Sequence, residues 1–296
     1  MSPPAPPLPD CDPPPRVPTR AAERLPAGTC DSHLHVFGPP ARYPLDPRRN
    51  YTPHECSLAD YRQVMEAIGV DRAVLVQPSV YGTDNSALLD ALRAGGAAFR
   101  GVAVLAPGTD DAALRAMHAL GVRGLRLNLV NPQVVGVPQV LALLERLAVL
   151  GLPWHLQVLA DLAREPDALR SLCERTDAPI VVDHMGKLPP AARDHPLFAL
   201  LKSGRCWVKL SAPYRASVEP PPYRDVAGLA QRLAEANPER VLWGTDWPHT
   251  ELRSGTPDAA LLAQLLHRWL PDAAMREQAC VINPARLYDF PLEETE

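Results

Sequence analysis

Short apolar runs alternate with longer amphipathic segments through most of the chain, from Thr29 onward. The apolar runs have the length of β-strands, and eight can be counted: 30–36, 73–79, 101–105, 124–129, 153–158, 179–184, 206–211 and 240–246. The intervening segments carry Ala, Leu, Arg and Glu at helical spacing and predict helices at 57–68, 86–95, 110–120, 138–150, 166–176, 195–202, 225–236 and 257–270. Such alternation is typical of βα units on a parallel sheet.

Eight βα units are the number that closes a (β/α)8 barrel, a fold that occupies about 250 residues as one domain. The chain has 296 residues, enough for one such barrel. A doubly wound open sheet is the alternative, but no Gly-rich phosphate-binding fingerprint follows any predicted strand. The sequence therefore predicts an α/β protein with a single (β/α)8 TIM barrel over residues 29–292.

The two ends of the chain differ from the barrel region. Prolines crowd residues 1–28, and proline fixes φ and lacks an amide donor, so that neither helix nor sheet is available there. We expect 1–28 to form a flexible arm and 293–296 a short C-terminal tail.

Composition excludes several classes of protein. Hydrophobic residues make up 46% of the chain and charged residues 22%, as in a globular enzyme with a sizeable core. The net charge is -4 and arginines are scattered, so nucleic acid is not expected as a partner. No apolar run approaches the roughly 20 residues of a membrane span, and the six cysteines form no Cys-x-x-Cys pair. We expect a cytoplasmic protein with reduced cysteines and no membrane partner; no oligomeric state is predicted.

Polar residues stand at the carboxyl ends of several predicted strands, where a (β/α)8 barrel builds its active site. His33 and His35 share one face of the first strand because side chains alternate along a strand. His184 closes the sixth strand and Asp246 the eighth. Each could be structural when taken alone, as a buried histidine or a turn-capping aspartate. Their joint occurrence at the ends of strands one, six and eight predicts a catalytic cluster.

Several short motifs between residues 30 and 288 carry a family resemblance. They are 31–39 (DSHLHVFGP), 51–53 (YTP), 76–79 (VQPS), 81–85 (YGTDN), 124–128 (GLRLN), 183–186 (DHMG), 209–211 (KLS), 214–215 (YR) and 244–249 (GTDWPH). At these residues the chain resembles the amidohydrolase-related (amidohydrolase 2) barrel hydrolases, and within them the branch of 2-pyrone-4,6-dicarboxylate lactonases and sugar lactonases.

The resemblance implies a hydrolase that opens the lactone ring of a small, carboxylated substrate during aromatic degradation. It implies Asp246 as the base that activates water, with His33, His35 and His184 around the scissile carbonyl. Arginine suits a carboxylate because its planar donors engage both oxygens. Four residues match positions that hold the substrate's carboxylate and carbonyl oxygens: Arg126, Arg215, Tyr51 and Ser79.

The chain departs from that branch at two places and leaves the metal question open. The branch carries a tyrosine on the fifth strand and a second arginine just beyond the fourth, whereas this chain has no tyrosine at 155–158 and no arginine at 130–134. The resemblance favours an enzyme without metal, in which an activated ester and arginine clamps replace a Lewis acid. The alternative is zinc bound by His33, His35 and Asp246, with His155 completing the set. We expect His249 to support the site or the fold rather than to act on substrate.

Other functions fit the same predicted barrel. They are a metal-dependent sugar or muconolactone lactonase, a lactone isomerase, an aromatic-acid decarboxylase and a binding protein without activity. The intact set of three histidines and one aspartate argues against the last of these.

Overall fold

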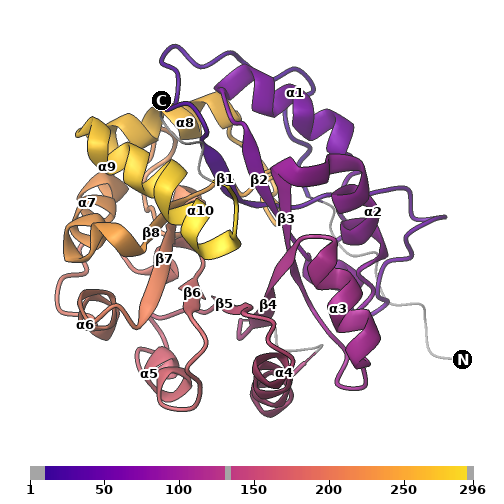
Figure 1. Cartoon of the computed structure of the whole chain (residues 1–296). Helices are drawn as coiled ribbons and strands as arrows, with labels where there is room; N and C mark the ends of the chain where they lie inside the picture. Colours follow the sequence, from indigo (N-terminus) through magenta and orange to yellow (C-terminus); the bar gives the residue numbers. More distant parts are fainter. Residues whose placement is uncertain (1–10, 131–134, 292–296) are drawn as a thin grey trace, which may run out of the picture.

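The fold is known from a computed structural model that describes residues 11–130 and 135–291. Eight parallel strands hydrogen-bond in sequence order and ring the centre of the molecule (Figure 1). The strands are β1 (Cys30–Leu34), β2 (Arg72–Val76), β3 (Phe99–Ala103), β4 (Val122–Asn128), β5 (His155–Leu159), β6 (Ile180–Val182), β7 (Cys206–Leu210) and β8 (Val241–Trp243).

The last strand meets the first through the segment that follows β8. Leu34 forms a parallel bridge with Trp247. The Asp246 amide donates to the His33 carbonyl, and the His35 amide donates to the Trp247 carbonyl, both at 2.8 Å. These bonds join the two edges of the sheet, so the predicted (β/α)8 barrel is confirmed and the open doubly wound sheet is excluded.

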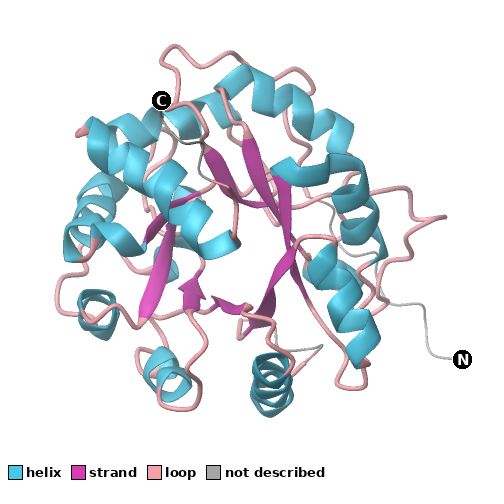
Figure 2. Cartoon of the chain, viewed as in Figure 1, coloured by secondary structure: helices cyan, strands magenta, loops and turns pink. Residues whose placement is uncertain are grey.

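Helices surround the strands on the outside (Figure 2). They are α1 (Leu58–Ile68), α2 (Ser86–Gly95), α3 (Asp111–Ala119), α4 (Val137–Val149), α5 (Ala168–Cys173), α6 (Pro196–Lys202), α7 (Ala227–Ala236) and α8 (Ala259–Trp269). In α1, Tyr61, Val64 and Ile68 are buried, which is the spacing of one helix face. Ser57 and Asp60 form a capping box at its start. No helix in the described ranges is long and apolar enough to cross a membrane.

Two further helices follow the eighth unit and are absent from the sequence prediction: α9 (Ala273–Glu277) and α10 (Asn283–Tyr288). Tyr288 and Phe290 pack in one small core with side chains of six strands: Cys30, Val74, Val76, Val102, Val181, Trp207 and Leu242. This core fills the barrel below the catalytic end. A layer of buried polar side chains, Gln157, Asp183 and Lys209, lies between this core and the carboxyl end of the barrel.

The structure describes the predicted arm from residue 11 onward. Residues 11–28 contain no helix or strand, and Cys11 and Leu25 are buried. The Asp12 amide donates to the Leu252 carbonyl at 2.8 Å. The flexibility of the arm stays a prediction, and both residues 1–10 and the predicted tail at 293–296 lie outside the described residues.

Candidate active site

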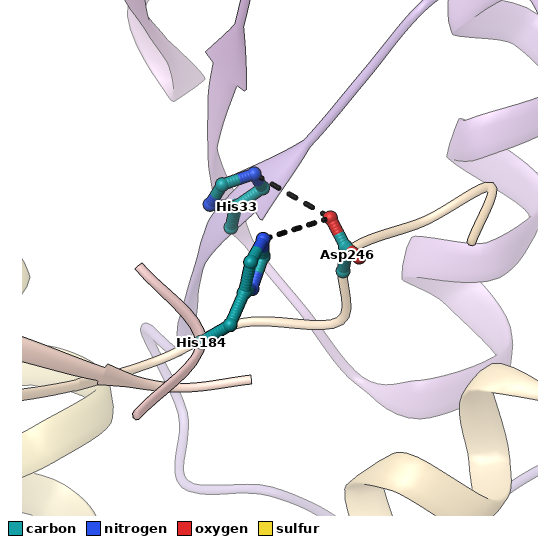
Figure 3. Close-up of side chains that lie close together, drawn as sticks. All are labelled: His33, His184 and Asp246. Atoms are coloured by element: carbon teal, nitrogen blue, oxygen red, sulfur yellow. Dashed lines mark ion pairs between the residues drawn. The ribbon is translucent and has the colours of Figure 1, made fainter. Parts of the chain in front are cut away.

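Four side chains from three strand ends meet at the carboxyl end of the barrel. His33 lies on β1, His35 directly after it, His184 after β6 and Asp246 after β8. His33 and His184 both approach the same oxygen of Asp246 (Figure 3). All four side chains are buried. The structure thus brings together the four residues that the sequence predicts as a cluster.

Two of these residues leave the sheet in an unusual backbone conformation. The predicted strands run to residues 184 and 246, whereas β6 ends at Val182 and β8 at Trp243. His184 has φ 51° and Asp246 has φ 60°, a left-handed conformation that costs roughly 1–2 kcal/mol for a non-glycine residue. Such strain is concentrated at functional sites. The strand predictions are too long here because the chain turns to direct these side chains into the barrel mouth.

The two oxygens of Asp246 have different surroundings. Oδ2 accepts a hydrogen bond from the Tyr214 hydroxyl at 2.6 Å and one from Arg215 Nε at 3.3 Å. Oδ1 has no hydrogen-bond partner among the described residues. Burial opposes the charge on Asp246, but His184 and Arg215 outweigh burial and hold the pKa of this carboxyl well below its usual range. Asp246 is therefore an anchored carboxylate with one uncommitted oxygen.

Three imidazole nitrogens surround that oxygen. The Nε2 atoms of His33, His35 and His184 lie 3.5, 3.6 and 3.7 Å from Asp246 Oδ1. These separations are too long for direct hydrogen bonds. The three nitrogens and this oxygen therefore face one another without bonding directly.

The partners on the far side of two rings set their tautomers. His35 Nδ1 lies 2.8 Å from the Val76 carbonyl, and His33 Nδ1 lies 3.2 Å from Asp183 Oδ1. Carbonyl and carboxylate oxygens only accept, so His35 Nδ1 carries the proton. The 3.2 Å contact with Asp183 favours the same tautomer for His33, although Lys209 Nζ lies 3.4 Å from the same Nδ1. Burial lowers the pKa of His33 to about 4, which keeps the ring neutral at pH 7. With Nδ1 protonated and the ring neutral, each Nε2 atom presents a lone pair to Asp246 Oδ1.

This arrangement suits a species that offers positive charge or protons. A water can donate to Asp246 Oδ1 and to one imidazole. The residues also fit a divalent cation, because metal-binding histidines usually donate their other ring N–H to a carboxylate or backbone carbonyl. His33, His184 and Asp246 place ligand atoms within 4.8 Å of one another, and His35 Nε2 faces the same oxygen. His184 thus joins the possible metal ligands, beyond the set predicted from the sequence.

A buried polar network inside the barrel supports His33. Lys209 Nζ donates to Gln157 Oε1 at 2.7 Å and to the Ser32 carbonyl at 2.8 Å, and it lies 3.6 Å from Asp183 Oδ1. Gln157 Nε2 donates to Asp183 Oδ2 at 3.1 Å. Burial lowers the pKa of Lys209 to about 8. The motif around Lys209 contributes to the family resemblance, but its role depends on partners distant in sequence.

A pocket of about 230 Å³ opens above the cluster. Its lining includes all four residues predicted to bind substrate: Tyr51, Ser79, Arg126 and Arg215. His35 and His184 form part of its wall. The pocket also includes polar residues to which the sequence analysis gives no role: Asn50, Asn128, Lys187, Thr250 and Glu251.

The predicted substrate-binding residues differ in how they are held. Arg126 is buried, and its NH1 donates to the Gln77 carbonyl at 2.7 Å. Burial raises the pKa of Tyr51, so its hydroxyl keeps its proton and can donate a hydrogen bond. Arg215 donates to Asp246 and so contacts the catalytic cluster as well as the pocket.

Two other histidines lie apart from the cluster. His155 begins β5 and packs edge-on against Tyr288, with ring centroids 5.2 Å apart. It therefore lies on the floor of the barrel, and the structure does not bring it to the three other histidines. His249 Nδ1 lies 3.5 Å from the Tyr214 hydroxyl, on the far side of the residue that holds Asp246. Residues 131–134, in the stretch without the second arginine, lie outside the described residues.

Comparison with known proteins identifies the family. The chain is 38% identical to the 2-pyrone-4,6-dicarboxylate hydrolase of Comamonas testosteroni, over 92% of this chain and 93% of that protein. It is 37% identical to the 4-sulfomuconolactone hydrolase of Rhizobium radiobacter, over 89% and 91% of the two chains.

A solved structure and a family model agree with these relatives. An apo crystal structure from Agrobacterium tumefaciens superposes with a TM-score of 0.79 at 31% identity, covering 90% of this chain and 98% of that one. The model of the amidohydrolase family matches residues 30–290. With this match across the whole barrel, the chain belongs to the amidohydrolase family.

Proposed function

We propose that the protein is a lactone hydrolase that acts on a small ring bearing anionic groups, with Asp246 as the base that activates water. One relative is named for a pyrone dicarboxylate and another for a sulfonated muconolactone. A pocket of about 230 Å³ lined by arginine and lysine suits a small anion of this kind. The alternatives are lactone isomerisation and decarboxylation of an aromatic acid.

The observation that carries this proposal is the uncommitted oxygen of Asp246. Its partner oxygen is held by Tyr214 and Arg215, so the carboxylate cannot rotate without losing two hydrogen bonds. Oδ1 faces the Nε2 atoms of His33 and His35, which present lone pairs. A water that donates to Oδ1 and to one of these nitrogens has its own lone pair free to attack a carbonyl.

Hydrolysis then needs proton transfer and stabilisation of the oxyanion. Water adds to the lactone carbonyl and gives one proton to Asp246, which later delivers it to the departing ring oxygen. His184 Nδ1 lies 2.9 Å from the Ser211 hydroxyl, which can donate or accept. When Ser211 donates, His184 carries its proton on Nε2 and can stabilise the oxyanion.

The low pKa of Asp246 restricts the substrate. A carboxylate whose pKa lies well below its usual range is a weak base toward ordinary water. The reaction is therefore favoured by an activated ester, such as a lactone conjugated to electron-withdrawing groups, or by a more acidic water. A divalent cation held by His33, His35, His184 and Asp246 would supply the second, by lowering the pKa of a bound water and polarising the carbonyl.

In this proposal, Arg126 binds the substrate's carboxylate. This side chain has two nitrogens beyond the NH1 that bonds Gln77, and it lines the same pocket as Tyr51 and Ser79. A protonated tyrosine and a serine are suitable donors to carboxylate or carbonyl oxygens. The remaining assignments are a small anionic substrate, no nucleic-acid or membrane partner, and a cytoplasmic location, which the free cysteines support. The oligomeric state stays open.

A panel of lactones and aromatic acids tests the proposal. We expect the purified protein to open at least one carboxylated lactone, with a ring-opened acid as product and no loss of carbon dioxide. Asp246→Asn serves as the matched control and should show no turnover. A new lactone as product would instead establish an isomerase, and released carbon dioxide a decarboxylase.

A further inference from the structure

The charged side chains of the pocket divide into those that are paired and those that are not. Arg215 contacts two carboxylates, Asp246 Oδ2 at 3.3 Å and Glu251 Oε2 at 2.9 Å. Its NH2 donates to the Thr250 carbonyl at 3.0 Å. Glu251 also accepts from Asn50 at 2.8 Å. Arg215 therefore has its charge balanced and donors on all three nitrogens engaged before a substrate binds.

Arg126 and Lys187 line the same pocket, and they differ from Arg215 in their ion pairs. Neither makes an ion pair with any residue in 11–130 or 135–291. Arg126 Nε is buried without a partner in those ranges, and Lys187 is only partly buried. Two cations that face a pocket without an ion-pair partner are suited to an anionic ligand.

The backbone places Lys187 beside the catalytic cluster. Residues His184–Lys187 form a short 3-10 turn, and φ is 51°, 53°, 65° and 53° through the turn. His184 and Lys187, at the two ends of this turn, both line the pocket. The strained turn thus presents a histidine to the reaction centre and an ammonium group to the pocket.

The two unpaired cations come from different parts of the mouth. Arg126 lies on β4 and Lys187 follows β6, with β5 between them in the barrel (Figure 1). Two inter-strand spacings separate these strands by roughly 10 Å. Leu159 of β5 lines the pocket as well. One substrate with two anionic groups can therefore engage both cations across an apolar residue.

We propose that Lys187 is a substrate-binding residue that takes a second anionic group, distinct from the one at Arg126, and that Arg215 is a positioning residue for Asp246. The inference rests on the proposed function, because it assigns two ends of the same substrate. It changes the role of Arg215, which the family resemblance gives to the substrate.

A binding experiment that needs no turnover tests Lys187. Calorimetric titration of the full chain compares benzene-1,3-dicarboxylate with benzoate, which lacks the second carboxylate. We expect the dicarboxylate to bind at least tenfold more tightly, the scale of one charge-assisted hydrogen bond. Lys187→Met should abolish this difference and Lys187→Arg should keep it. Lys202→Met, at an exposed position that ends α6, is the matched control and should also keep it.

The outcomes separate the two proposals. A wild-type protein that binds both acids equally, or a Lys187→Met variant that keeps the difference, overturns the inference on Lys187. A protein that shows the expected binding but opens no lactone contradicts the proposed function and leaves the Lys187 site standing.

Kinetics on an anionic lactone test the contrasting role of Arg215. Arg215→Met should lower kcat while the preference for the dicarboxylate stays intact. Lys187→Met should raise KM about tenfold with little change in kcat. Loss of the dicarboxylate preference in Arg215→Met would assign Arg215 to the substrate and overturn the positioning role.

Discussion

The histidines at the two ends of the barrel are held in different ways. At the mouth, the Nδ1 atoms of His33, His35 and His184 contact Asp183, the Val76 carbonyl and Ser211, respectively. On the floor, neither ring nitrogen of His155 has a hydrogen-bond partner among the described residues. Its ring is held by packing against Tyr288.

The difference separates the histidines that we propose for the chemistry from a buried histidine outside the site. A ring whose far nitrogen is fixed by an acceptor presents its near nitrogen in a defined tautomer and direction. A ring held by shape alone presents neither. Burial and residue type are the same at both ends, so the hydrogen bonds behind the ring distinguish them.

The largest expected effect is at the mouth, at Asp246. Asp246→Asn keeps the shape of the side chain but removes the proton acceptor. We expect a loss of more than a hundredfold in kcat/KM, about 3 kcal/mol of transition-state stabilisation. His155→Phe, the floor counterpart, should retain activity within about twofold. Steady-state assays of both variants measure these effects. A larger loss of kcat/KM in His155→Phe than in Asp246→Asn would contradict the comparison.

A smaller effect is expected behind the mouth, at Asp183. Asp183→Asn removes the charge that His33 and Lys209 face, which leaves a buried ammonium group without its carboxylate. Support residues of this kind contribute about 10- to 100-fold to activity. We expect a loss in that range, measured as kcat/KM on a folded variant. Unchanged activity would mean that Asp183 does not orient His33.

At His155, on the floor of the barrel, we expect an effect on the free energy of unfolding rather than on activity. Burial, followed by the charge of Lys209, lowers the pKa of His155 from 6.5 to about 3. The unfolded chain therefore binds a proton below about pH 6.5 that the folded chain does not bind until about pH 3. Stability attributable to this group is fully present above pH 6.5 and is lost as the pH falls, by up to about 1.4 kcal/mol per pH unit.

His155→Phe should consequently flatten the acid side of the stability profile. The variant keeps an aromatic ring against Tyr288 and removes the titrating group. Urea unfolding at pH 7.5 and pH 5 should show a smaller loss for this variant than for the wild type. His54→Gln, at an exposed position, is the control and should behave as the wild type. Parallel profiles for all three proteins would rule out a contribution from His155.

The smallest expected effect on activity is that of removing metal ions by chelation. The family resemblance favours an enzyme without metal, although the three imidazoles and Asp246 fit a divalent cation. We expect activity to survive exhaustive chelation within about twofold. Metal analysis of the same samples is the control. Stoichiometric zinc, with activity lost on chelation and restored by zinc, would make the mouth histidines ligands.

Much of the fold follows from the sequence, because periodicity alone reveals the eight strand and helix units. The predicted strand bounds are wrong near the site. The predicted strand runs to residue 246, whereas β8 ends at Trp243, and Asp246 takes a left-handed conformation that no periodic pattern encodes. The helices α9 and α10 are short, and nothing in a barrel pattern requires them.

The site is predictable to the level of residue type and strand end. His33, His35, His184 and Asp246 stand out because they are polar and stand where a (β/α)8 barrel builds its active site, at the carboxyl ends of the strands. The state of Arg215 depends on Glu251, which lies 36 residues away, and the position of Lys187 depends on a left-handed turn. Neither is visible in a local motif. His155 is a polar strand residue like the others. Its depth in the barrel and the lack of hydrogen-bond partners for its ring among the described residues set it apart, and neither can be read from the sequence.

The central claim is that Asp246 directs a water onto a lactone carbonyl, and an isotope experiment tests it most directly. A lactone that turns over in the panel is opened in water labelled with oxygen-18, and the product is analysed by mass spectrometry. The account predicts one labelled oxygen per product, in the new carboxylate, and no labelled product with Asp246→Asn. A product without label, or equal labelling by the variant, would contradict it.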